Sequence, residues 1–358
     1  GSTFYSRGTG GGATFDNLGT LDFVGGTVFR MDQGTASLEN PSASLIVASS
    51  GGTGGSIAGS TAAQVINNAG TLRADNATLQ IKAALNDTGG TIEAINGGTI
   101  RFSSTGTGGG HTTVAGTTFN AALPGDTIRL GGRINSLEGT ISGTGAVQFQ
   151  EQVVVNQALS YFDFGATEIR MMGAGGSAHW QSWPAGNVME ARSPVRHDGS
   201  GGYNMFRIDG TFRNVLGNTV TLDNGNIFYF YGTGGGATFE NLGTLDMVST
   251  TDFTMDQGTA KLLNTGTLRA TSAAGALITG ASATQTFDNQ GKVIVDGTTA
   301  NSTLTINGTN TVVQFDGVDT LTGGDWRVLS GANTATLNLN SAPNGSITTV
   351  GAGATVVL

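Results

Sequence analysis

The side chains best suited to ligand chemistry gather between residues 161 and 213. This segment holds two of the three tryptophans, two of the three histidines and several arginines. Flat aromatic faces stack on sugar rings, and Arg and His side chains hydrogen-bond hydroxyl and carboxylate groups. We therefore predict a ligand-binding site formed by His179, Trp180, Trp183, Arg192, Arg196, His197 and Tyr203. The alternative is that the two tryptophans pack a small hydrophobic cluster beneath a long loop.

Catalysis would require carboxylates that the sequence does not bring together. Glycoside hydrolysis uses two carboxyl groups about 5–9.5 Å apart. Glu168, Glu190 and Asp198 fall in the segment above, but nothing in the sequence fixes their distances. Four other acids recur at equivalent positions of a repeat, which favours a structural role because an active site is needed once: Asp22, Asp32, Asp246 and Asp256. The sequence therefore predicts no catalytic residues and no enzyme.

Metal and cofactor chemistry is not indicated either. Cysteine is absent, which excludes thiolate nucleophiles, Cys-based zinc sites and disulfides. His179 and His197 are well separated in the sequence, and no third ligand lies at the spacing of a zinc motif. We predict no metal and no cofactor.

Composition excludes three further classes of protein: those that bind nucleic acid, those that insert into a membrane, and collagen. The formal net charge is −9, and this acidic balance leaves no basic surface for a phosphate backbone, so we predict no nucleic-acid partner. No run of about 18 apolar residues occurs, so we predict no membrane insertion. The 60 glycines lack a three-residue period and accompany only 5 prolines, which excludes collagen.

A long internal repeat organises the chain. Residues 8–36 return as residues 232–260, at a constant offset in the numbering. Over residues 8–37, 23 of 30 positions are identical to their counterparts without a gap, and the match reaches back to Phe4 and Tyr5. Such a copy indicates tandem units of about 224 residues. We expect the sequence to be a fragment of a longer tandem-repeat protein.

A shorter motif recurs inside the long repeat. It reads FDNLGTL from Phe15, INNAGTL from Ile66, FENLGTL from Phe239, LLNTGTL from Leu262 and FDNQGKV from Phe287. Its spacing of roughly 22 residues is typical of a solenoid. The Asn-x-Gly element predicts a corner in which positive φ is adopted, and the alternation that follows predicts a half-buried strand. The corner positions are Asn17, Gly19, Asn68, Gly70, Asn241, Gly243, Asn264, Gly266, Asn289 and Gly291.

The aligned asparagines leave two interpretations open. Stacked identical amides can form a side-chain ladder along the inside of the solenoid. Alternatively, each asparagine caps only its own turn.

These patterns predict one all-β parallel solenoid over residues 1–358. No apolar stripe with helical period continues along the chain, so we predict no substantial helix. Coils occupy residues 1–160 and 214–358, and an irregular loop excursion over 161–213 carries the predicted binding residues. Trp326 is interpreted as a packing residue. The apolar end at Thr355–Leu358 predicts an open strand edge and end-to-end self-association.

The repeats resemble a known class of bacterial proteins. The segments INNAGTLRA and LNTGTLRA resemble the coils of filamentous-haemagglutinin-like and autotransporter-type surface adhesins. The stretch FDGVDTLTGGDWRVLSGANTATLNL, from Phe315 to Leu339, is similar to segments of very large bacterial surface proteins. The resemblance implies a right-handed parallel β-helix at the bacterial cell surface or secreted from the cell.

The resemblance also implies a function. Proteins of this class are stalks that mediate attachment to surfaces, cells or glycans, so the implied partners are a surface glycan or protein receptor and neighbouring repeats of the same chain. The alternative is a carbohydrate-active β-helix, either a polysaccharide lyase or a glycosidase, that acts beside residues 161–213.

Overall fold

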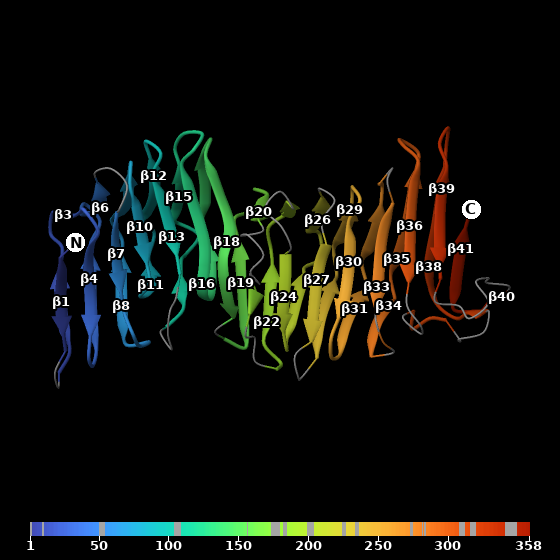
Figure 1. Cartoon of the computed structure of the whole chain (residues 1–358), viewed down its shortest axis with the longest axis horizontal. Helices are drawn as coiled ribbons and strands as arrows, with labels where there is room; N and C mark the ends of the chain where they lie inside the picture. Colours follow the sequence, from blue (N-terminus) through green and yellow to red (C-terminus); the bar gives the residue numbers. More distant parts are fainter. Residues whose placement is uncertain are drawn as a thin grey trace. The chain divides into compact units, whose positions relative to one another are not determined.

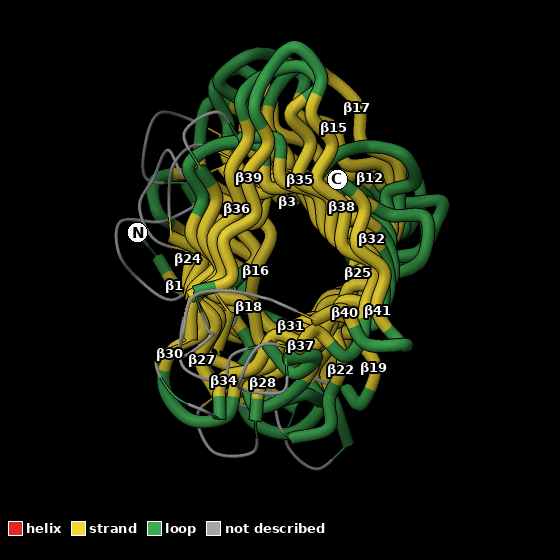
Figure 2. Tube along the Cα trace, turned by 90° about the vertical axis from the view of Figure 1, so that its right-hand side faces the viewer, coloured by secondary structure: helices red, strands yellow, loops and turns green. Residues whose placement is uncertain are grey.

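The described part of the chain consists of strands joined by turns, bends and irregular segments. The computed structural model describes residues 2–8, 11–49, 54–103, 109–155, 157–172, 180–181, 185–198, 204–223, 227–232, 236–272, 275–280, 282, 284–307, 312–315, 320–340 and 349–358. These residues include no helix (Figure 2), and therefore none long and apolar enough to cross a membrane. The chain divides into two compact units, Gly1–Ile169 (unit 1) and Arg170–Leu358 (unit 2).

Unit 1 consists of three stacks of parallel strands (Figure 1). The first stack contains β1 (Thr3–Arg7), β4 (Thr27–Asp32), β7 (Gly55–Ala58), β10 (Thr78–Ile81), β13 (Thr99–Phe102), β16 (Thr127–Glu138) and β18 (Ala146–Val155). The second contains β2 (Ala13–Asp16), β5 (Ala36–Asn40), β8 (Gln64–Asn68), β11 (Ala84–Asp87), β14 (His111–Thr112), the second half of β16 and β19 (Leu159–Asp163). The third contains β3 (Thr20–Val24), β6 (Leu45–Ser49), β9 (Thr71–Asp75), β12 (Thr91–Ile95), β15 (Thr118–Ala121) and β17 (Thr140–Gly143).

Unit 2 repeats this arrangement. Its first stack contains β21 (Trp180–Gln181), β24 (Asn204–Ile208), β27 (Ile227–Gly232), β30 (Asp252–Asp256), β33 (Ala276–Gly280), β36 (Ser302–Asn307) and β39 (Ala335–Leu339). The second contains β22 (Val188–Ala191), β25 (Thr211–Asn214), β28 (Ala237–Asn241), β31 (Ala260–Asn264) and β34 (Gln285–Asn289). The third contains β23 (Val195–Asp198), β26 (Thr219–Asp223), β29 (Thr244–Met247), β32 (Thr267–Ala270), β35 (Lys292–Gly297), β38 (Gly324–Ser330) and β41 (Ala354–Val357). β37 (Thr320–Leu321) pairs with β40 (Thr349–Val350), and β20 (Ile169–Met172) spans the division between the units.

The predicted fold is confirmed: each unit is a right-handed parallel β-solenoid. Most strands alternate buried and half-exposed residues, as in β8 and β31, because successive side chains point to opposite faces of a strand. The inward residues, such as Leu72, Ile92 and Leu268, are fully buried. Since one coil exposes its apolar edges, the core is completed only by the coils above and below it.

The segment 161–213 contributes strands to the stacks. In unit 2, β22 pairs with β25, and β23 pairs with β26, in uninterrupted parallel register. Residues 173–179, 182–184 and 199–203 of this segment lie outside the described residues.

The long repeat reproduces backbone conformation in detail. Gln33 and Gly34 have φ of 60° and 59°, and their counterparts Gln257 and Gly258 have φ of 55° and 58°. A Cβ on either glycine would lie less than 3.0 Å from a carbonyl oxygen of an adjacent coil, that of Gly8 or that of Gly232. The same turn is therefore built twice, with a glutamine in the left-handed region both times.

We expect Gln257→Gly to stabilise the protein by about 0.5–1 kcal/mol. A residue with a Cβ in the left-handed region destabilises the folded state by roughly 1–2 kcal/mol, and glycine removes this strain. Part of the gain, about 0.4–1 kcal/mol, is offset because glycine increases the entropy of the unfolded chain. Urea unfolding of the variant and the parent measures the difference. Asp256→Gly, one residue earlier in a strand without positive φ, should destabilise the protein; stabilisation by both changes would contradict the explanation.

Candidate functional site

The predicted corners lie where a strand of the second stack turns into the third stack. They connect β2 to β3, β8 to β9, β28 to β29, β31 to β32 and β34 to β35. None of the five asparagines or five glycines has positive φ, so the expectation of a left-handed corner is wrong. A different property of glycine must explain the motif.

Close stacking of the coils explains the glycines. A Cβ on Gly243, Gly266 or Gly291 would lie less than 3.0 Å from backbone oxygens of the preceding coil, and the same holds for Gly70. The carbonyl of each glycine also accepts a bond from the next coil, for example Lys292 N to Gly266 O at 2.8 Å. The missing side chain therefore allows the corners to stack at hydrogen-bonding distance. Gly19 is the exception, with nothing within 4 Å of such a Cβ.

An internal ladder of amides runs beside the corners of unit 1. Asn17 Nδ2 donates to Asn40 Oδ1 at 2.8 Å, and Asn40 Nδ2 donates to Asn68 Oδ1 at 2.6 Å. Asn68 Nδ2 then donates to the carboxylate of Asp87. Asp87 also accepts from the backbone amides of Gly89 and Gly90 and from the hydroxyl of Thr117. The ladder of unit 1 thus ends on a buried acceptor that is well supplied with donors.

Unit 2 contains a second ladder of the same kind. Asn214, Asn241, Asn264 and Asn289 are joined by Nδ2-to-Oδ1 bonds of 2.8, 2.7 and 2.8 Å. Each Nδ2 group that donates to the next asparagine also donates to the backbone carbonyl three residues after that asparagine. Asn264 Nδ2, for example, donates to Lys292 O at 3.0 Å. All four asparagines are fully buried. The ladder interpretation is therefore confirmed, and each rung ties two coils together.

The predicted arginines of the binding site belong to ion pairs, Arg192 within its own coil and Arg196 with the next coil. Arg192 Nη2 lies 2.8 Å from Glu190 Oε2, and Arg196 Nη1 lies 2.5 Å from Asp223 Oδ2. Arg213 bridges Glu190 at 3.0 Å and Glu240 at 2.6 Å. Burial alone would raise the pKa of Glu190, but hydrogen bonds and charge from Arg192 and Arg213 outweigh burial and lower it. These arginines therefore neutralise acids, on the preceding strand of the same coil for Arg192 and on strands of neighbouring coils for Arg196 and Arg213.

The remaining predicted ligand residues are not brought together on a described surface. His197 is fully buried and packs edge-on against Phe228, with ring centroids 5.5 Å apart, so it lies in the core of unit 2. Trp180 lies in β21, but its side chain is outside the described ones, and His179, Trp183 and Tyr203 lie outside the described residues altogether. The predicted aromatic cluster stays a prediction.

A second buried histidine predicts a pH response. His111 is 1% exposed, both of its ring nitrogens are without partners among the described residues, and it packs against Phe102. Burial lowers the pKa of His111 from 6.5 to about 4. Between these two pKa values the unfolded chain binds a proton at this histidine and the folded chain does not. The free energy of unfolding should therefore fall by about 3 kcal/mol as the pH drops from 6.5 toward 4.

Urea unfolding at pH 7, 5.5 and 4.5 would measure this contribution. His111→Leu should remove it, so the stability gap between the variant and the parent should shift in favour of the variant as the pH falls. Parallel pH profiles for both proteins would show that His111 does not titrate as described.

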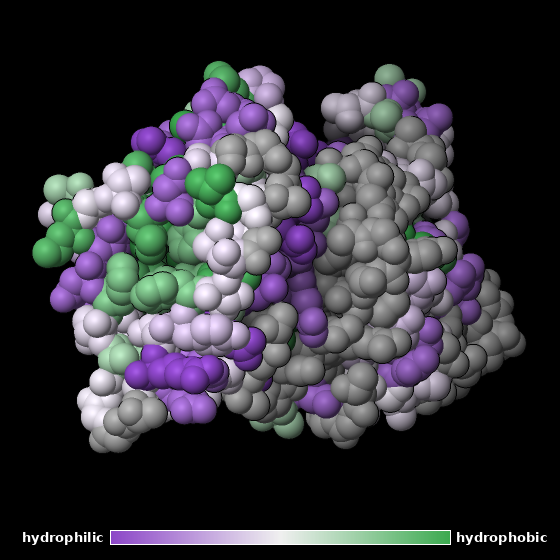
Figure 3. Space-filling model, turned by 60° about the vertical axis from the view of Figure 1, so that its left-hand side comes forward, coloured by the Kyte–Doolittle hydropathy of each residue, from purple (hydrophilic) through white to green (hydrophobic). Residues whose placement is uncertain are grey.

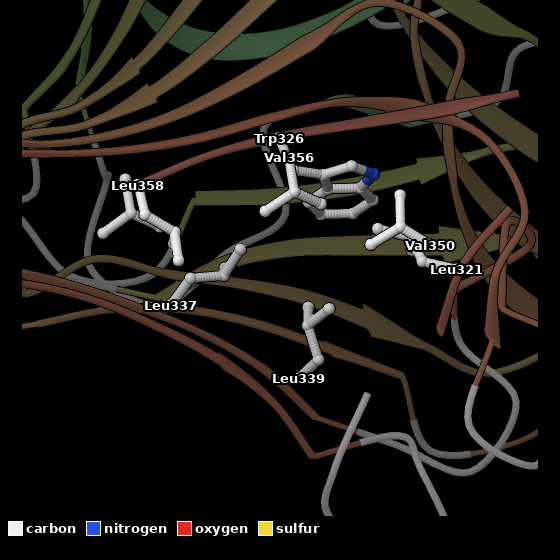
Figure 4. Close-up of a pocket in the computed structure, with 8 residues that line it drawn as sticks. Leu321, Trp326, Leu337, Leu339, Val350, Val356 and Leu358 are labelled. Atoms are coloured by element: carbon white, nitrogen blue, oxygen red, sulfur yellow. The ribbon is translucent and has the colours of Figure 1, made fainter. Parts of the chain in front are cut away.

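The last coil of unit 2 leaves an apolar pocket of about 300 Å³ (Figure 4). Leu321, Trp326, Leu337, Leu339, Val350, Val356 and Leu358 line it together with Val328. Trp326 is 1% exposed and donates from Nε1 to Gly323 O at 2.9 Å, so its interpretation as a packing residue is confirmed. Val356 and Leu358 are 40% and 93% exposed, and the pocket is an open layer of the core.

The interactions of the described polar residues join coils to coils. Among them, no group of three or more His, Cys, Asp or Glu residues is placed to hold a metal ion. Sequence reasoning missed Asn40, Asn214 and Asp87 as ladder members. Their signal was present as a polar residue two positions after an inward Leu or Phe, but Asn40 and Asn214 lack the Gly two positions later that defined the motif.

Comparison with known proteins adds no relative. No protein-family model, no curated protein and no solved structure matches this chain.

Proposed function

We propose that this chain is a stalk section of a large bacterial adhesin, at the cell surface or secreted, that supports attachment to surfaces, cells or glycans. One observation carries the proposal: the second copy of the long repeat, residues 232–260, reproduces the coil-to-coil contacts of the first, from the Gln-Gly turn to the corner and its buried asparagine. Repetition of contacts that join coils increases the length of a solenoid, whereas an active site is needed only once.

The contacts between coils suit a mechanical role. Backbone ladders, buried amide rungs and ion pairs such as Arg73 with Glu93, at 2.5 Å, all join adjacent coils. Their direction is along the stack, so tension applied along the stack is carried by many hydrogen bonds at once.

Single-molecule stretching from the two chain ends tests the mechanical part. Successive ladder residues are 19 to 28 residues apart, so release of one coil should lengthen the chain by roughly 6–10 nm. We expect a series of such steps. Smooth extension at low force would contradict the stalk.

A polysaccharide panel tests the adhesive part against the enzymatic alternative. Retention of glycans without any depolymerised product, lost in Trp180→Ala/Trp183→Ala and kept in Tyr5→Ala, would support an adhesive site in residues 161–213. Tyr5 is a suitable control because it is an aromatic residue 48% exposed outside that segment. Release of shortened polysaccharide would overturn the proposal in favour of a lyase or glycosidase.

A further inference from the structure

The outer side of β1, β2 and β3 carries no strand among the described residues, since these strands pair only with β4, β5 and β6. We propose that this end face of unit 1 is an interface that accepts one more coil, with the sequence of residues 204–223, supplied by a neighbouring copy of the repeat. The inference goes beyond a general stalk role by naming the face, the occupant and the register.

Unit 2 contains the same face in its covered form. By the constant offset of the long repeat, β1, β2 and β3 correspond to β27, β28 and β29. These three strands are paired on that side with β24, β25 and β26, which are residues 204–223. The covered copy therefore supplies a template for the open one.

The aromatic packing of the two faces is the same, but the exposure is not. In unit 1, Phe4 stacks on Phe29 at 5.2 Å with an interplanar angle of 26°. In unit 2, Phe228 stacks on Phe253 at 5.1 Å and 30°. Phe4 is 50% exposed and Phe228 only 1%. Figure 3 shows hydrophobic surface gathered at this end of unit 1, as expected for a face shaped for burial.

The polar groups of the open face match those that the covering coil satisfies. Asn241 Oδ1 accepts from Asn214 Nδ2 at 2.8 Å. Among the described residues, the corresponding Oδ1 of Asn17 accepts only the amide of Gly19, at 3.4 Å. An asparagine at the position of Asn214 would extend the ladder of unit 1 by one rung.

Charge at the rim follows the same pattern. Glu240 Oε2 accepts a hydrogen bond from Nε of Arg213, in the covering coil, at 2.6 Å. Its counterpart Asp16 is exposed and has no ion-pair partner in the described part of the chain. The carboxylate is retained where an arginine of an added coil would meet it.

Gly19 gives the sharpest sign of an absent neighbour. Its counterpart Gly243 must be glycine, because a Cβ there would lie less than 3.0 Å from Asn218 O and Val215 O of the covering coil. At Gly19 a Cβ would meet nothing within 4 Å. Glycine at this position is explained by a coil that the open face accepts.

A fusion of residues 187–224 in front of residue 1 of the full chain tests the proposal. Gly1 corresponds to Gly225, so the junction keeps the spacing that unit 2 has. We expect backbone amides of β1, β2 and β3 to exchange with deuterium on the order of tenfold more slowly than in the parent chain, because edge strands become interior strands. An appended segment of the same composition in scrambled order should give no such protection.

Gly19→Ala separates docking from general stabilisation. In the parent chain it should leave exchange and unfolding unchanged, whereas in the fusion it should abolish the added protection. Equal protection by the scrambled segment, or protection that survives Gly19→Ala, would overturn the proposal. Protection of the same strands in the unfused chain at high concentration, with a dimer in sedimentation, would make the other end of a second copy the occupant and would also overturn it. The assignment of the occupant to a neighbouring repeat rests on the proposed stalk function. Hydrogen exchange, however, measures only whether the added coil docks. A failure of the stalk proposal in the stretching or glycan experiments can therefore be distinguished from a failure of this inference.

Discussion

Gly266→Ala is expected to destabilise the protein by about 3 kcal/mol, the upper end of what overpacking typically costs. The added Cβ would lie less than 3.0 Å from the carbonyl oxygen of Gly243 and from the carbonyl group of Leu242. These are backbone atoms of the short connection between β28 and β29, two strands that are each paired on both sides, so they cannot yield as a flexible side chain could. Overpacking against a rigid neighbour belongs to the mechanisms that produce the largest effects of single substitutions.

Three glycines distinguish the steric cause from the conformational one. Gly25 has φ of 65° with open space around it, so Gly25→Ala should cost roughly 1 kcal/mol from backbone strain alone. Gly19→Ala should cost nothing measurable, because Gly19 has neither positive φ nor a near neighbour. Urea unfolding followed by circular dichroism gives the order. A Gly266→Ala protein as stable as Gly19→Ala would show that the coils can separate at the corner without loss.

The solenoid was predictable because its signal repeats. Stacked coils share one pattern, so Leu72, Leu245 and Leu268 each follow an Asn-x-Gly-Thr element and are each fully buried. The physical role of the glycine was not predictable from one chain. A corner with positive φ and a corner of close approach both favour glycine, and only the neighbouring coil distinguishes them.

Partners between coils were also beyond the sequence. Coil length varies from 19 residues between Asn68 and Asp87 to 28 between Asn40 and Asn68. A variable period shifts which residues face each other, so Arg213 could not be matched with Glu190 and Glu240 before the register was known. Arg196 resembles a ligand group in the sequence for the same reason, because its partner Asp223 lies on the next coil. The partner of Arg192, in contrast, is Glu190, two residues earlier in the sequence.

Asn264→Ala is expected to destabilise the protein by about 3–5 kcal/mol. The substitution removes the bond from Asn241 Nδ2 to Asn264 Oδ1 and both bonds that Asn264 Nδ2 donates. It leaves the buried Oδ1 of Asn289 and the part-buried carbonyl of Lys292 without these donors. Each buried group left unsatisfied costs about 1–3 kcal/mol, whereas loss of an exposed bond costs far less because water replaces it.

Two comparisons isolate the ladder from general packing. Asn340→Ala also removes a hydrogen bond between side-chain amides of two coils, from Asn340 Nδ2 to Asn307 Oδ1 at 2.8 Å. Because this pair is exposed, the loss of stability should stay below about 1 kcal/mol. Asn264→Asp keeps an acceptor for Asn241 but places a carboxylate against the Oδ1 of Asn289. Its instability should therefore be greatest at neutral pH and should lessen as acid protonates the new carboxyl group, which then donates to Asn289. An Asn264→Asp protein as stable as the parent at pH 7 would show that the ladder does not require alternating donors and acceptors. The asparagines would then contribute through packing at the corner and not through their hydrogen bonds.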